Sequence, residues 1–240
     1  MISRVAVITG AAGGIGSATV DLFREEGWFV VGIDREGEAA ANADRFVLAD
    51  LADERSLRGA IDGLYDLGQV DALVNNAASS LSRRLVDTTT PEWDELMAVN
   101  LRAAFLATRY AHPLLRGRGA AVVNVSSVHA FASTAGVAAY ATSKGALLAL
   151  TRASALDLAA DGIRVNAVIP GAVDTPMLGR GADDEERVRS IAARTPLARV
   201  ADPREIGQAI LFLADGQRSS FITGSALVVD GGALARLGTE

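Results

Sequence analysis

Residues 5–16 read VAVITGAAGGIG, a continuous apolar run that passes directly into a glycine-rich turn. Apolar side chains at consecutive positions indicate a strand covered on both faces, as in a parallel sheet. The residues after the turn, 15–26, carry apolar side chains at helical spacing. The stretch therefore predicts a buried strand, a tight turn and a helix, the first unit of a doubly wound α/β fold.

The same alternation continues to the end of the chain. Further apolar runs predict strands at 29–34, 46–49, 72–75, 121–125, 165–169 and 226–229. Helical spacing predicts helices between them at 56–67, 91–110, 141–159 and 203–214. No linker, repeat or low-complexity tract interrupts this order, so we expect one domain over residues 1–240 with a mostly parallel sheet of about seven strands and helices on both faces. Residues 177–200, rich in glycine and charge, are a candidate substrate lid within it.

Composition narrows the classes of function. Lys plus Arg is 23 and Asp plus Glu is 29, a net charge of −6, which argues against a nucleic-acid partner. There is no cysteine and there are 2 histidines, so we expect no metal site. The N-terminus lacks a signal-peptide pattern, and no apolar run approaches the length of a membrane span. We therefore expect a soluble, cytoplasmic protein that does not bind membranes.

The first turn and the second strand together predict a dinucleotide site. A helix that begins directly after a glycine-rich turn offers free N–H groups and a positive dipole end to a pyrophosphate. The second predicted strand ends in Asp34, 18 residues after Gly16, where an acidic residue can hold a ribose 2′-hydroxyl. The alternative for the turn alone is an ordinary strand-to-helix connection.

Further short motifs follow in a fixed order. They are TGAAGGIG at 9–16, Asp50, NNAA at 75–78, Asn100, Ser127, YATSK at 140–144 and Pro170-Gly171. As a set they resemble the TGxxxGxG, NNAG, YxxxK and PG motifs of the short-chain dehydrogenase/reductase family over nearly the whole chain. Two features depart from that pattern: Ala78 stands where the family has glycine, and the link between Asp34 and Asp50 is short.

The resemblance implies a Rossmann-like fold and a nicotinamide cofactor. It places Asp50 and the backbone of Leu51 at the adenine, and Asn76 and Ala78 at the adenosine ribose. The remaining implied cofactor contacts are Gly10, Gly14, Ile15, Gly16, Asp34, Tyr140, Lys144, Pro170, Gly171, Val173 and Thr175. We expect NAD rather than NADP, because Asp34 repels a 2′-phosphate and Gly13, before Gly14, supplies no base. Arg35, next to Asp34, opposes this expectation without overturning it.

Tyr140 and Lys144 are four residues apart, so their side chains project from one face of a helix. An ammonium about 4 Å from a phenol supplies about 4 kcal/mol at an effective dielectric near 20, enough to lower a tyrosine pKa by about 2 to 3 units. We expect Lys144 to lower the pKa of Tyr140 in this way. The resemblance implies that Tyr140 moves the proton, that Lys144 also holds the nicotinamide ribose, and that Asn100 keeps a water in a relay to Lys144.

Ser127 precedes Tyr140 by 13 residues, the spacing of the family that the chain resembles. Ser126 is its rival, and the alternation of a strand sends only one of the two toward the substrate. We choose Ser127 as the group that binds the substrate oxygen. The same alternation returns His129 to that side, although a merely exposed histidine is the alternative. His112, before Pro113, is expected to be structural.

These residues predict an NAD-dependent oxidoreductase that transfers a hydride between the nicotinamide and a secondary alcohol or ketone. An NADPH-dependent 3-oxoacyl carrier-protein reductase is the alternative within the family. A non-catalytic NAD-binding regulator is the alternative from another class, and the complete Asn, Ser, Tyr and Lys set argues against it.

Residues 141–156, ATSKGALLALTRASAL, carry only two charges and no polar stripe. Such a face is expected to be covered, so we predict a homo-oligomer with this helix at a two-fold contact. The resemblance suggests a tetramer. The alternative cover is residues 91–110 or the C-terminal tail of the same chain.

Overall fold

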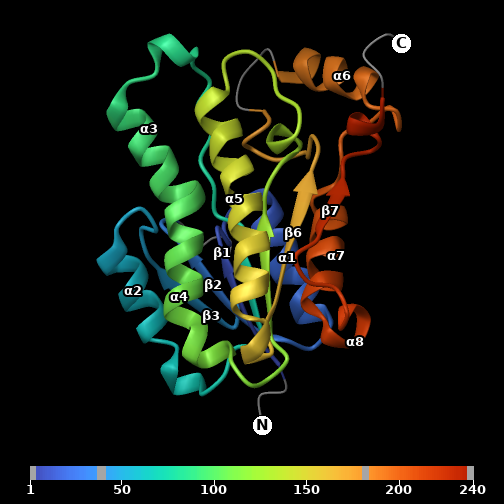
Figure 1. The fold of residues 1–240 in the computed structure, drawn as a ribbon. Coiled ribbons are helices and arrows are strands. Elements are labelled where there is room, and N and C mark those ends of the chain that lie inside the picture. Colours follow the sequence, from blue (N-terminus) through green and yellow to red (C-terminus); the bar gives the residue numbers. More distant parts are fainter. Residues whose placement is uncertain (1–3, 37–41, 180–183, 237–240) are drawn as a thin grey trace.

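Seven parallel strands form one sheet at the centre of the molecule (Figure 1). A computed structural model describes residues 4–36, 42–179 and 184–236. The strand order is β3-β2-β1-β4-β5-β6-β7, and every neighbouring pair is parallel. The strands are β1 Val5–Thr9, β2 Phe29–Asp34, β3 Arg45–Leu48, β4 Ala72–Asn75, β5 Ala121–Val125, β6 Arg164–Pro170 and β7 Ala226–Val229. The expected doubly wound α/β fold is confirmed.

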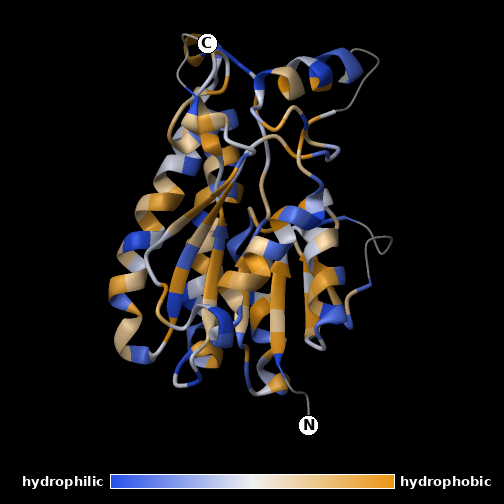
Figure 2. Ribbon diagram, turned by 90° about the vertical axis from the view of Figure 1, so that its right-hand side faces the viewer, coloured by the Kyte–Doolittle hydropathy of each residue, from blue (hydrophilic) through white to orange (hydrophobic). Residues whose placement is uncertain are grey.

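Helices cover both faces of the sheet (Figure 1). One face carries α2 Glu54–Asp62, α4 Ala103–Leu115 and α5 Ala138–Asp157, and the other carries α1 Gly14–Glu25 and α7 Pro203–Ala214. The central strands are buried on both sides, which is why their sequences are apolar at successive positions (Figure 2). The short α8 Gly216–Ser219 follows α7. No helix within the described ranges is both long and apolar enough to cross a bilayer.

Several helix boundaries differ from the sequence-based expectation. The segment expected as one helix at 91–110 consists of α3 Thr90–Met97, a π-helical turn at Ala98–Arg102, and α4, which continues through Pro113. The helix expected at 56–67 begins earlier, because Asp53 caps α2 by accepting from Arg55 N.

The segment expected to be only a lid loop contains a helix, α6 Asp184–Arg194. It lies beyond the carboxyl ends of β6 and β7 (Figure 1). Residues 180–183 of the proposed lid are outside the described part of the chain. Most residues of α6 are polar, and its few apolar residues repeat weakly at helical spacing. The sequence pattern therefore does not predict this helix.

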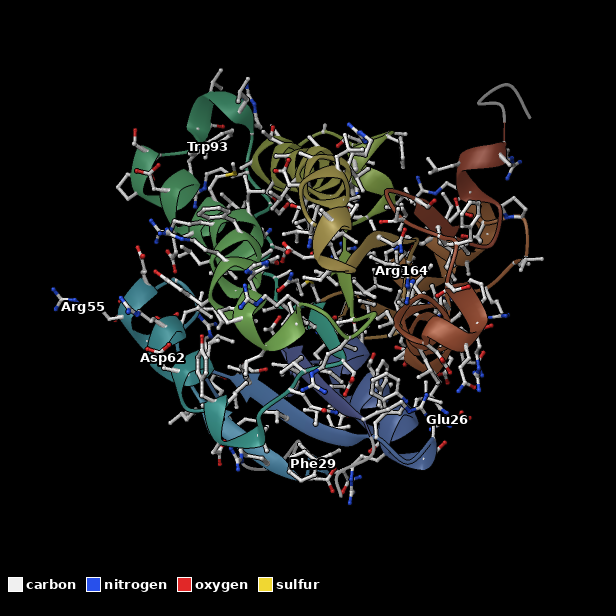
Figure 3. All side chains as sticks on the ribbon, turned by 60° about the horizontal axis from the view of Figure 1, so that its bottom comes forward. Glu26, Phe29, Arg55, Asp62, Trp93 and Arg164 are labelled. Carbon is white, nitrogen blue, oxygen red and sulfur yellow. The ribbon has the colours of Figure 1, made fainter. Side chains whose placement is uncertain are left out.

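A buried arginine ties β6 to α7. Arg164 is 9% exposed and donates to the carbonyls of Leu213 and Ala214 at 2.9 and 3.2 Å. It also donates to Ser219 Oγ at 3.0 Å. Figure 3 shows Arg164 inside the fold, whereas Arg55 of α2 projects outward. The guanidinium thus satisfies carbonyls that the end of α7 leaves without helical partners.

Candidate active site

Four of the residues expected at the site follow neighbouring strands, which are β1, β4, β5 and β6. Gly10, Asn76 and Gly171 come directly after three of these strands, and Ser127 comes two residues after the fourth. Because carboxyl ends of parallel strands meet at one edge of a sheet, these residues lie together at that edge.

The glycine-rich turn forms the floor of the site. Gly10 has φ +66°, and a Cβ there would lie 2.7 Å from Ala77 Cα, so only glycine fits. Gly14, Ile15 and Gly16 begin helix α1. Its first turn contains no acidic residue, and no side chain caps it. A helix start of this kind leaves its N–H groups and positive dipole end for an anion. The turn therefore fits the pyrophosphate of a dinucleotide.

Thr9 and Asn76 brace this turn against β4. Thr9 Oγ1 donates to Val74 O and accepts from the backbone N–H groups of Asn76 and Ala77 at 3.1 and 3.2 Å. The Asn76 amide donates to the carbonyls of Thr9 and Gly10 at 3.0 and 3.1 Å. Asn76 thus has a bracing role that the sequence did not predict. Ala78, two residues further on, is partly buried.

Asp34 faces the same turn from the end of β2. Its Oδ2 accepts from Ala12 N at 2.9 Å, and its Oδ1 accepts from Arg35 N at 2.7 Å. The guanidinium of Arg35 turns to Glu36, 3.6 Å away, in an exposed ion pair. A negative charge is therefore fixed beside the glycine turn, with lone pairs left to accept further hydrogen bonds.

Asp50 and Leu51 follow β3 in the loop before α2. Asp50 is exposed, and its Oδ1 accepts from Ala52 N at 2.9 Å, while Leu51 is buried. Asp50 therefore lies in a solvated local turn, and its contact with the adenine stays a prediction.

The loop after β6 closes the site from the other side. Gly171 packs on Asp230, where a Cβ would lie 2.8 Å from Asp230 Cα. A Cβ on Gly14 would lie 2.6 Å from Thr175 Cγ2, so the loop of Pro170, Val173 and Thr175 touches the start of α1. The glycine-rich turn and the loop after β6, which both belong to the expected cofactor site, are thus in contact. Val173 is buried and pairs with Ala201 in an isolated parallel bridge.

Tyr140 lies in the first turn of α5, and its phenol is close enough to the Ser127 hydroxyl for that group to lower the pKa of Tyr140. Ser126 points elsewhere, since its Oγ donates to Lys144 O at 2.8 Å. The geometry therefore brings Ser127, and not Ser126, to the tyrosine. The argument from strand alternation was wrong, however, because β5 ends at Val125 and Ser127 caps the 3₁₀ turn Val128–Ala130.

The pKa of Tyr140 also differs from the expectation. Burial raises it, and the hydrogen bond with Ser127 opposes part of that rise. Lys144 Nζ lies 5.8 Å from the centroid of the Tyr140 ring, and its charge is not among the causes of the shift. Among the chain's own groups, desolvation therefore outweighs the attraction of the lysine for a phenolate.

Lys144 is 2% exposed, and burial lowers its pKa to about 8. Its ammonium donates to Val125 O at 2.9 Å. Within the described part of the chain this carbonyl is its one hydrogen-bond acceptor, so two of its three donors are left for another group. A buried, partly unsatisfied ammonium beside Tyr140 fits the hydroxyls of a ribose.

Asn100 occupies the π-helical turn and is 1% exposed. Its amide accepts from Ser79 N at 2.8 Å, donates to Ser79 O at 2.9 Å and donates to Ser143 Oγ at 3.1 Å. It therefore contacts the neighbour of Lys144 in α5 and not Lys144 itself. The extra residue of a π turn directs the side chain to these partners.

The two histidines lie in different parts of the molecule. His129 packs its ring edge against Tyr140, with centroids 5.8 Å apart, from the 3₁₀ turn rather than from a strand. His112 in α4 is 2.8 Å from Asp161, an ion-pair contact in keeping with a structural role.

Sequence reasoning missed the roles of two polar residues around this site, Thr9 and Ser143. Ser143 Oγ donates to Tyr140 O at 2.7 Å and accepts from Asn100, so it links α5 to the π turn. Thr9 carried a usable signal, a hydroxyl at the end of a fully buried strand. Ser143 had none, because its partner Asn100 is far away in the sequence.

The fold and this edge of the sheet define a dinucleotide-binding α/β protein, and comparisons with known proteins narrow the class. The model of a family described as enoyl-(acyl carrier protein) reductase matches residues 10–233. The chain belongs to the short-chain dehydrogenase/reductase family, whose members are oxidoreductases that use NAD or NADP.

Individual relatives are similar over almost their whole length. Cyclopentanol dehydrogenase of Comamonas sp. (strain NCIMB 9872) is 39% identical, covering 95% of this chain and 96% of the relative. The 2-(R)-hydroxypropyl-CoM dehydrogenase of Xanthobacter autotrophicus is 39% identical, covering 96% and 98%. The solved structure of Thermoplasma acidophilum aldohexose dehydrogenase has a TM-score of 0.93 at 32% identity, covering 99% of this chain and 96% of that one.

Proposed function

We propose that this protein is an NAD-dependent dehydrogenase that interconverts a secondary alcohol and a ketone. The observation that carries the proposal is the grouping of Ser127, Tyr140 and the buried Lys144 at the sheet edge that also holds the uncapped start of α1. The similarity to alcohol dehydrogenases of this family supports the reaction type.

Each residue of the group has a task that follows from its position. The cofactor, when bound, accepts or delivers the hydride. Ser127 donates to the substrate oxygen, and Tyr140 takes or returns the hydroxyl proton through its Oη. Lys144 stabilises the phenolate that forms, while its free donors hold the ribose. Asn100 acts through Ser143 by fixing the start of α5, whose first two turns carry Tyr140 and Lys144.

Asp34 supports NAD over NADP. Its carboxylate is held toward the glycine turn, while the neighbouring Arg35 pairs with Glu36. A 2′-phosphate at this position would meet the negative charge, whereas a 2′-hydroxyl can donate to it. The NADPH-dependent 3-oxoacyl carrier-protein reductase is the second candidate, because the enzyme of that name from Thermotoga maritima is 37% identical over 95% of this chain.

Two dissociation constants, for NAD and NADP, test the cofactor choice. We expect tighter NAD binding, and Asp34→Ala should narrow the ratio by removing both the ribose contact and the repulsion. Asp50→Ala is the matched control, since a contact at the adenine affects both cofactors equally. Equal affinities in the wild type, or tighter NADP, would overturn this part of the proposal.

A substrate panel read by NADH absorbance tests the reaction itself. It should contain cyclic alcohols, polyols, sugars and hydroxy acids, with acetoacetyl thioesters and NADPH for the second candidate. Turnover of a secondary alcohol with NAD is the expected result. Binding of NAD without turnover of any compound would instead favour the non-catalytic regulator.

The assembly is proposed to be a homo-oligomer, with a tetramer suggested by the family. An apolar groove of about 750 Å³ separates α5 from the segment of α3, the π turn and α4. Its lining includes Met97, Leu101, Phe105, Ala146, Leu150 and Ala153. The chain's own residues 91–110 therefore flank α5 without covering it, which supports a second copy as the cover.

Residues 177–200 remain our candidate for a lid within a single catalytic domain. The end of this segment is anchored, because Leu197 N donates to Gly231 O at 3.2 Å. Met177 and Leu197 are exposed large apolar side chains of this segment. They would gain a partner if the segment closed over an apolar part of the substrate.

A further inference from the structure

His129 is a polar group at the site for which the reaction above has no use. Its backbone N–H donates to Ser127 Oγ at 3.2 Å, and its ring meets the Tyr140 ring edge-on at 79°. The imidazole is therefore held beside both residues that contact the substrate oxygen.

Two long contacts around the ring favour one tautomer. His129 Nδ1 lies 3.4 Å from Ser133 Oγ, and Ser133 Oγ donates to Thr134 O at 3.5 Å. A hydroxyl has one proton, so with that proton on the Thr134 carbonyl the serine oxygen accepts from Nδ1–H. Nε2 is then the unprotonated nitrogen, and within residues 4–36, 42–179 and 184–236 it has no hydrogen-bond partner. Burial lowers the pKa of His129, which keeps the ring neutral near pH 7.

We propose that His129 Nε2 accepts a hydrogen bond from a second hydroxyl of the substrate, on the carbon next to the one that is oxidised. The preferred substrates are then vicinal diols, as in a polyol or a cyclic diol, rather than alcohols with a single oxygen. A carboxylate does not suit this position, because it has no proton to donate to the nitrogen. This inference rests on the proposed function and names the substrate class of the same site.

Cyclopentanol and the two 1,2-cyclopentanediols are a suitable test set, since they share one ring and differ by one hydroxyl. With NAD, we expect kcat/KM for the better diol to exceed that for cyclopentanol by about tenfold, the contribution of one hydrogen bond. His129→Phe should bring this ratio close to one, chiefly through KM of the diol. His129→Asn, which keeps an acceptor at a shorter reach, should give an intermediate ratio.

His112→Phe is the matched control, the same substitution at the chain's other histidine, and it should leave the ratio as in the wild type. A wild-type ratio near one, or a ratio that His129→Phe does not change, would overturn the proposal. Affinities of the diol and of cyclopentanol for the enzyme with NAD, measured by calorimetry, separate the two levels of inference. If both compounds bind and neither is oxidised, the proposed function fails, while the affinity ratio still decides the role of His129.

Discussion

Tyr140 is the residue on which the proposed proton transfer depends. Burial raises its pKa, which the nearby Ser127 hydroxyl partly offsets, so the neutral phenol is the resting form among the chain's own groups. A group in this form can give a proton to a ketone oxygen, and taking a proton from an alcohol requires that the phenolate be stabilised at that moment.

Tyr140→Phe removes the proton-transfer group and keeps the ring. We expect kcat to fall by at least about a hundredfold, the usual contribution of a positioned acid or base, while the dissociation constant of NAD changes only a few-fold. Steady-state kinetics and a cofactor titration measure both. Tyr110→Phe, at a partly buried tyrosine of α4 that hydrogen-bonds Glu54, is the control and should keep the wild-type kcat. Full activity in Tyr140→Phe would contradict the mechanism.

Lys144 is the only lysine in the chain, and its burial has a cost in stability that depends on pH. Its pKa falls from 10.5 to about 8 on folding, a difference of about 3 kcal/mol. Below pH 8 the folded state carries the buried charge and the full penalty. Between about pH 8 and 10.5 the unfolded chain binds more protons than the folded chain, so stability rises with pH.

The variant Lys144→Met lacks this titration. Relative to it, the wild type should gain up to about 3 kcal/mol of unfolding free energy as the pH rises from 8 to 10.5. Urea unfolding of both proteins across this range measures the difference. Arg152→Met, which removes an exposed cation from the same helix, should differ from the wild type by a constant amount. A pH-independent difference for Lys144→Met would show that folding does not shift the pKa of Lys144.

At the scale of elements, one buried side chain links strand β6 to the end of helix α7 by hydrogen bonds. Arg164 reaches the last carbonyls of α7 and the hydroxyl of Ser219 from inside the core. Burial lowers its pKa, and the charge of Asp215 opposes this. Since α7 packs on α1, this junction also supports the helix whose first turn is the proposed pyrophosphate site.

Arg164→Met should therefore be strongly destabilising. It leaves the Ala214 carbonyl without its donor and takes one of two donors from the carbonyls of Leu213 and Ile222, and we expect a loss of about 2 to 4 kcal/mol of unfolding free energy. Denaturant unfolding at pH 7 checks this value. Arg189→Met, which removes an exposed ion pair to Glu185, is the control and should cost less than about 1 kcal/mol. Equal losses of unfolding free energy in the two variants would show that the buried hydrogen bonds of Arg164 stabilise the fold no more than an exposed ion pair does.

At the scale of the whole molecule, the groove beside α5 decides the state of assembly. Leu150 and Ala146 line it, and Leu156 further along α5 is 81% exposed. An apolar face of this extent is expected to be covered by another chain.

Light scattering at micromolar concentration should therefore give a multiple of the 24.8 kDa chain mass, with four copies the expected number. Leu150→Glu or Ala146→Glu should dissociate the oligomer, because each places an unpaired carboxylate in an apolar contact. Leu48→Glu, at an exposed residue at the end of β3, is the control and should keep the wild-type mass. A wild-type mass equal to that of one chain would contradict the prediction of a homo-oligomer.

The sequence by itself determined the local features of the fold and the site. These are the buried apolar runs, the glycine-rich turn, the position of Asp34 and the spacing of Tyr140 and Lys144. These depend on local periodicity and on residue types that only a few positions tolerate, such as Gly10 with its positive φ. Single-sequence patterns therefore placed all seven strands within one or two residues of their observed bounds.

Tertiary structure alone decided the rest, because it depends on partners that are distant in the chain. Ser127 rather than Ser126 meets Tyr140 because β5 ends at Val125 and the chain turns into a 3₁₀ helix. Asn100 binds Ser79 and Ser143 because a π turn redirects it. The upward shift in the pKa of Tyr140 also arises only in the folded protein, since desolvation depends on how many neighbours surround the phenol and no local spacing encodes that number.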